Sequence, residues 1–74
     1  MPATWIKYQN NDNATVIFNL DRATSFRHIA SGQESFVEVY AEGTMHSIMR
    51  LTDPEAYRAV MSYVAITTGY KLES

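Results

Sequence analysis

Alternating apolar and polar residues predict β-structure over most of the chain. Strands are expected at about residues 4–9, 14–20, 24–30, 34–41 and 44–51. Turn-forming residues separate them: residues 10–13 after the first, Ser31 and Gly32 after the third, and the pair Glu42 and Gly43, which is typical of a two-residue hairpin. The pattern therefore predicts an antiparallel meander of four or five strands.

Residues 24–30 allow a second interpretation. Phe26, Ile29 and Ala30, preceded by Asp21, also fit a short helix that ends at Gly32. We favour a strand because the connections on both sides suit a meander.

The last third of the chain predicts a helix over about residues 53–68. Thr52 is the expected N-cap, Glu55 completes a capping box three residues later, and Pro54 lies in the first turn. Gly69 marks the end, because glycine readily adopts the left-handed conformation found there. We expect one α+β domain spanning residues 1–74, with the C-terminal helix packed across one face of the sheet.

Alternation divides the predicted sheet into two faces. One is nearly all apolar, includes His28, Met45 and Met49, and suits the helix. The other is mixed and includes Ile17, Ile29 and His46. Apolar patches of this kind are rarely left uncovered on monomers, so the mixed face is our candidate interaction face. Its principal residues are Trp5, Arg27, Phe36, Tyr40, Ile48 and Arg50.

The predicted helix supplies a second candidate surface. Its apolar residues cover more than half of the circumference, whereas packing on one sheet requires about a third. The surplus predicts a further contact through Tyr57, Met61 and Val64. Alternatively, part of this width is a rim of tyrosines whose hydroxyls stay in water.

Composition and charge narrow the function classes. The chain has 74 residues, 46% of them hydrophobic, no cysteine and a formal charge of −2. A domain this small gains little stability from its core alone, and it has no thiols for disulfides or metal sites. The first seven residues show no signal-peptide pattern and no apolar run is long enough for a membrane helix, so we expect a cytoplasmic protein that does not bind membranes.

The predicted partner is a second copy of the chain, since closed symmetric dimers are the commonest soluble oligomers. Another protein would use the same face. The arrangement of a meander with a C-terminal helix also resembles that of the small single-strand-binding coactivators of the Whirly kind, which implies stacking of bases on aromatic side chains. The negative net charge and Glu38, between Phe36 and Tyr40, disfavour nucleic acid.

Residues that carry enzyme chemistry are few. The chain has no glycine-rich phosphate loop and no metalloprotease, nucleophile-elbow or calcium-loop motif. Alternation places His28 in the core and His46 at the surface on opposite faces, which disfavours a shared metal site. Glu34 and Glu42 lie about 26 Å apart on a strand, too far for paired carboxylates. We therefore expect a binding domain without catalytic activity, cofactor or metal.

Overall fold

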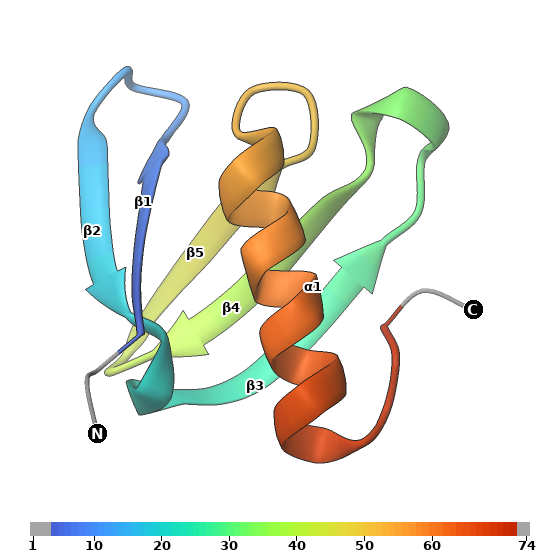
Figure 1. The fold of residues 1–74 in the computed structure, drawn as a ribbon. Helices are drawn as coiled ribbons and strands as arrows, with labels where there is room; N and C mark the ends of the chain where they lie inside the picture. Colours follow the sequence, from blue (N-terminus) through green and yellow to red (C-terminus); the bar gives the residue numbers. More distant parts are fainter. Residues whose placement is uncertain (1–3, 73–74) are drawn as a thin grey trace.

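The computed structural model describes residues 4–72, which form five antiparallel strands followed by one helix (Figure 1). This confirms the predicted α+β class and the strand interpretation of residues 24–30. Short 3₁₀ turns, Leu20–Arg22 and Gly32–Glu34, precede the third and fourth strands. The elements are β1 (Trp5–Gln9), β2 (Thr15–Asn19), β3 (Ala23–Ile29), β4 (Phe36–Ala41), β5 (Thr44–Met49) and α1 (Pro54–Thr68).

The strands form two sheets, whereas the sequence pattern predicted one meander. β1 pairs with β2, and β3, β4 and β5 form a three-stranded sheet. The break lies at the turn after β2, where the Asn19 side chain accepts the N–H of Asp21 at 3.0 Å and Leu20 is fully buried. After this turn the chain forms β3, which is the edge strand opposite β5 in the three-stranded sheet. β3 therefore does not continue the β1–β2 ladder (Figure 1).

The helix covers the inner side of both sheets. α1 contacts β1, β4 and β5 and lies in front of the three-stranded sheet in Figure 1. Within residues 4–72, no helix combines the length and apolar character needed to cross a bilayer. The core joins the hairpin, the second sheet and the helix through Ile6, Tyr8, Phe18, Leu20, Val37, Val39, Ala41, Ile48, Ala56, Tyr57, Val60 and Val64.

The helix begins differently from the predicted capping box. Asp53 is the N-cap, and its side chain makes no cap hydrogen bond. Its carboxylate instead accepts the backbone N–H of Gln9 at 3.1 Å, which ties the start of the helix to β1. The end is as predicted: Gly69 has a φ of 80° and donates its N–H to the carbonyl of Ala65 at 3.1 Å.

The side chains of β5 point the opposite way from the sequence prediction. Glu42 and Gly43 have φ values of 51° and 80°, the paired positive values of a type I′ turn. Val39 therefore faces His46, and Val37 faces Ile48. Residues paired across antiparallel strands share a face, so His46 and Ile48 are buried beside the two valines. The outer positions assigned to Ile48 and His46 were wrong, as were the inner positions assigned to Met45 and Met49.

Candidate interaction surface

The residues of the predicted mixed face lie in separate parts of the structure. Trp5 lies on the outer face of the β1–β2 hairpin. Phe36, Tyr40 and Arg27 lie on the outer face of the three-stranded sheet, where Arg27 is directly opposite Glu38. Ile48 belongs to the core. These residues therefore do not form one continuous surface.

The outer face of the three-stranded sheet carries an ion pair at its centre. The Arg27 guanidinium contacts a Glu38 carboxylate oxygen at 2.6 Å from one nitrogen and 2.7 Å from another. Tyr40 and Met45 lie directly opposite one another beside it, and both are exposed. Because Arg27 is paired, this face carries less free positive charge than its sequence suggests.

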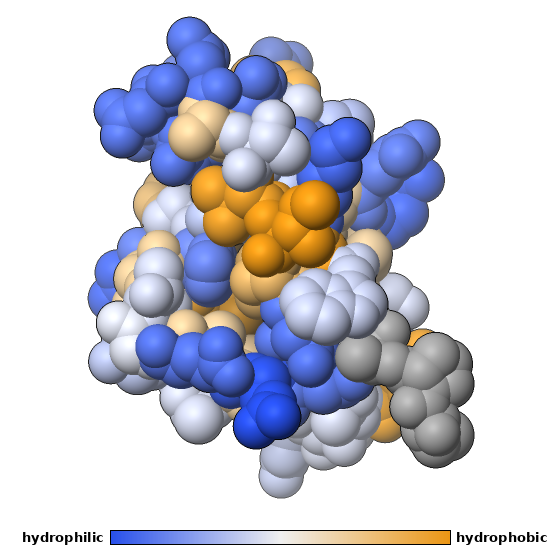
Figure 2. Space-filling view, turned by 90° about the vertical axis from the view of Figure 1, so that its left-hand side faces the viewer, coloured by the Kyte–Doolittle hydropathy of each residue, from blue (hydrophilic) through white to orange (hydrophobic). Residues whose placement is uncertain are grey.

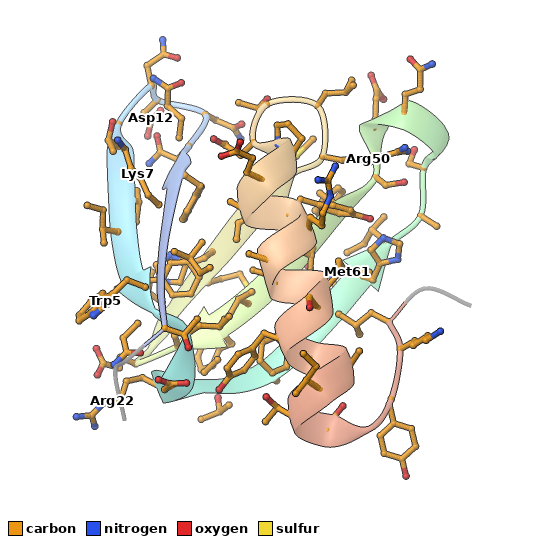
Figure 3. All side chains as sticks on the ribbon, in the orientation of Figure 1. Trp5, Lys7, Asp12, Arg22, Arg50 and Met61 are labelled. Atoms are coloured by element: carbon orange, nitrogen blue, oxygen red, sulfur yellow. The ribbon has the colours of Figure 1, made fainter. Side chains whose placement is uncertain are left out.

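The second candidate surface, on the helix, is mostly internal. Tyr57 and Val64 are buried against the sheets, and Met61 is half-buried. Met61 and Arg50, which follows β5, line a cavity of about 450 Å³ (Figure 3). The alternative of a tyrosine rim does not describe Tyr57, whose hydroxyl lies 2.7 Å from Nε2 of the half-buried His28. The extra apolar width of the helix is thus largely taken up by the second sheet.

His46 joins the hairpin to the second sheet. Its Nδ1 lies 2.9 Å from the hydroxyl of Tyr8, and its ring stacks on that of Phe18 with centroids 4.0 Å apart. Burial lowers the pKa of His46 below its usual value. Burial also raises the pKa of the Tyr8 hydroxyl, and the negative charge of Asp53 adds to this effect. The surroundings of His46 and Tyr8 therefore favour the neutral form of both side chains.

Asp21 links Thr4, immediately before β1, to the helix. One carboxylate oxygen accepts the N–H of Thr4 at 3.0 Å, and the other accepts the hydroxyl of Tyr63 at 2.9 Å. These hydrogen bonds, first the one from Thr4 and then the one from Tyr63, lower the pKa of Asp21. The carboxylate thus has a structural role in positioning β1 and α1.

The outer face of the hairpin is the most exposed apolar surface among the strands. Trp5 is 63% exposed and Ile17 is 61% exposed. Lys7 lies directly opposite Ile17, and Trp5 lies diagonal to Ile17 on the same face. We call Trp5, Lys7 and Ile17 the hairpin surface. Figure 2 looks at this side of the molecule and shows a hydrophobic patch bordered by hydrophilic residues.

A cavity of about 480 Å³ lies between the hairpin and the start of β5. Trp5 and Ile17 line one side, and Thr44 and Glu42 line the other. Arg22 lies at its border and approaches Glu42 at 3.8 Å, with both side chains largely exposed. The cavity extends the hairpin surface toward the second sheet.

The described side chains form no cluster of metal-ligating groups. Within residues 4–72, no three histidine, aspartate or glutamate side chains come together in a way that could hold a metal ion. His28 and His46 point to the same inner side, contrary to the sequence prediction, but each is hydrogen-bonded to a different tyrosine.

Comparisons with known proteins identify no relative: no family model matches the chain, and no curated protein or solved structure matches it significantly. The surface must therefore be interpreted from its own geometry. The sequence prediction included Trp5 among its principal residues but gave Ile17 a secondary place. The signal for Ile17 was present in β2, whose sequence Thr-Val-Ile-Phe-Asn has no charge and no proline to protect a strand edge.

Proposed function

We propose that this protein is a small, non-enzymatic binding domain that forms a homodimer through the hairpin surface. Two observations carry this proposal: Trp5 and Ile17 are both more than 60% exposed, and β2, which contains Ile17, has no second neighbouring strand among residues 4–72. Exposed apolar side chains beside an unpaired strand edge favour association with another chain.

Size supports the proposal. A domain of 74 residues without cysteine buries a limited fraction of its surface, so a second copy would add stability that the core does not supply. Tryptophan is also among the residues that contribute most to the free energy of protein interfaces.

The outer face of the three-stranded sheet is the weaker alternative for a dimer. Tyr40 and Met45 are exposed there, but the Arg27–Glu38 ion pair and Ser47 interrupt the apolar area. The same ion pair counts against binding of single-stranded nucleic acid, which requires cations free to contact phosphates.

Solution mass measured by size-exclusion chromatography with light scattering, over a wide dilution range, tests the proposal. We expect a dimer, and Trp5→Ala should weaken it by roughly 30-fold, as for loss of an interface tryptophan. Ile66→Ala is the matched control, because Ile66 is 82% exposed but lies on α1.

A protein that remains monomeric at the highest concentration would contradict the proposal. Oligonucleotide binding at low salt would then be measured, with Arg27→Glu as the variant that should abolish it. A dimer that is unchanged in Trp5→Ala would place the interface on another surface.

A further inference from the structure

Four strands have only one neighbour among the described residues, and two of these are covered. β1 packs against α1, and the N–H of Gln9 is taken by the Asp53 carboxylate. β5 is flanked by the hairpin, where His46 contacts Tyr8 and Phe18. The edge of β1 is therefore occupied by the helix, and the edge of β5 borders the hairpin across a groove that Val16 and Ser47 line.

The two remaining edges, those of β3 and β2, differ in the features that discourage pairing with another strand. β3 carries the charged Arg27, and its register with β4 shifts between Ala23 and Ser25. Charges and such irregularities discourage pairing with another chain. β2 has neither feature and lies at the left-hand side of Figure 1, where Ile17 is 61% exposed. β2 is therefore the edge best suited to pair with another strand.

The register of the hairpin shows which backbone groups of β2 point outward. The N–H of Leu20 donates to the carbonyl of Thr4 at 2.7 Å, so these two residues form a hydrogen-bonded pair. Such pairs alternate along an antiparallel ladder. The N–H and C=O groups of Thr15, Ile17 and Asn19 therefore point away from β1, and none of the described hydrogen bonds outside the ladder uses them.

We propose, building on the self-association proposed above, that two copies pair β2 with β2 in antiparallel fashion about a twofold axis at Ile17. An axis at this position is the one that uses all three outward-facing residues. Ile17 faces Ile17 of the second copy, and Thr15 faces its Asn19 on both sides of the axis. The result is a continuous four-stranded sheet in the order β1, β2, β2, β1.

The charges at the two ends of the hairpin complement this register. Asp12 and Arg22 are each five residues from Ile17, in opposite directions along the chain. Figure 3 shows them at opposite ends of the hairpin. The twofold axis brings Asp12 of each copy toward Arg22 of the other, which forms two ion pairs. Within one copy, Asp12 has no ion pair among the described residues, and Arg22 has only the 3.8 Å approach to Glu42.

The side chains also fit the register. On the outer face, Ile17 packs against its counterpart, and within each copy Trp5 lies diagonal to Ile17, within reach of an aromatic ring. On the inner face, Val16 faces Phe18 of the second copy and extends the core. Stable interfaces bury about 800 Å² on each partner. Since five-residue strands alone bury less, we expect a dimer that dissociates on dilution.

Sedimentation equilibrium on the full chain tests the register through the backbone. Proline at position 17 removes an outward N–H that the hairpin itself does not use, so Ile17→Pro should retain the monomer fold and lose the dimer. Ile17→Thr keeps the N–H and the β-branch and should retain most of the dimer. Circular dichroism checks the fold of each variant.

Charge reversal tests the register without touching the strand. Asp12→Arg and Arg22→Asp should each weaken the dimer by about tenfold, as expected for two exposed ion pairs. The double variant D12R/R22D should restore it. If Ile17→Pro fails to fold, the three charge-reversal variants test the register on their own.

The outcomes separate the two proposals. A wild-type monomer overturns the self-association itself. A wild-type dimer that persists in folded Ile17→Pro, or that D12R/R22D does not restore, overturns the register but leaves self-association in place.

Discussion

Replacing Ile48 with valine tests the inward orientation of β5, on which the whole core depends. Ile48 is fully buried and faces Val37 on the neighbouring strand. Removing one buried methyl group from isoleucine costs about 1 kcal/mol, as lost transfer free energy plus a residual cavity. A domain of 74 residues has a total unfolding free energy of about 4–11 kcal/mol. The loss is therefore a substantial fraction of the total.

Thermal unfolding followed by circular dichroism provides the measurement. A loss of about 1 kcal/mol lowers the Tm of a domain this size by about 4–8 °C. Ile66→Val makes the same chemical change at an exposed position on α1, where the effect should stay within about 0.5 kcal/mol. Both variants are measured at one protein concentration, because the proposed self-association would raise the apparent Tm. Equal Tm values for the two variants would refute the inward orientation of Ile48.

Two further predictions concern the His46 joint and the β4–β5 turn. Because burial lowers the pKa of His46 from 6.5, the unfolded chain binds the proton more tightly. The unfolding free energy in urea should therefore be level above about pH 7 and fall as the pH drops through 6.5, by at most about 1.4 kcal/mol per pH unit. His46→Gln should lose this dependence and His28→Gln should keep it; the reverse result would contradict the assignment. At the turn, Gly43→Ala should lower stability by about 1 kcal/mol, because φ there is +80°. Glu42→Asn should raise the Tm, since asparagine favours positive φ, and a lower Tm would argue against the type I′ geometry.

The error in β5 shows how two sequence signals can conflict. The apolar character of Met45 and Met49 suggested that they lie inside. The two-residue turn at Glu42 and Gly43 requires the opposite, because Ala41 and Thr44 then face one another and fix every later pair. Turn geometry was the stronger constraint. Methionine tolerates a half-exposed outer face, whereas a one-residue slip would bring Ser47 into the core in place of Ile48.

The candidate surface was only partly accessible from sequence. Trp5 was placed correctly on an exposed face, and the apolar character of Ile17 was noted. Their separation from Phe36 and Tyr40 was not evident, because it depends on the break between the two sheets. Alternation assigns a side chain to one of two faces, but it does not say whether two strands belong to the same sheet.

The sequence by itself determined the features that arise within a few residues of one another. The turns, the strand segments and the end of the helix at Gly69 follow from local backbone preferences, which act wherever the segment lies. Only the tertiary structure decided which strands pair, which helix residues are buried and which edge is open. These outcomes depend on contacts between distant segments, such as Asp53 with Gln9 and His46 with Tyr8. Among residues 4–72, β2 has no second neighbouring strand, because the hairpin packs on α1 and on His46 of β5 without joining the hydrogen-bond ladder of the three-stranded sheet.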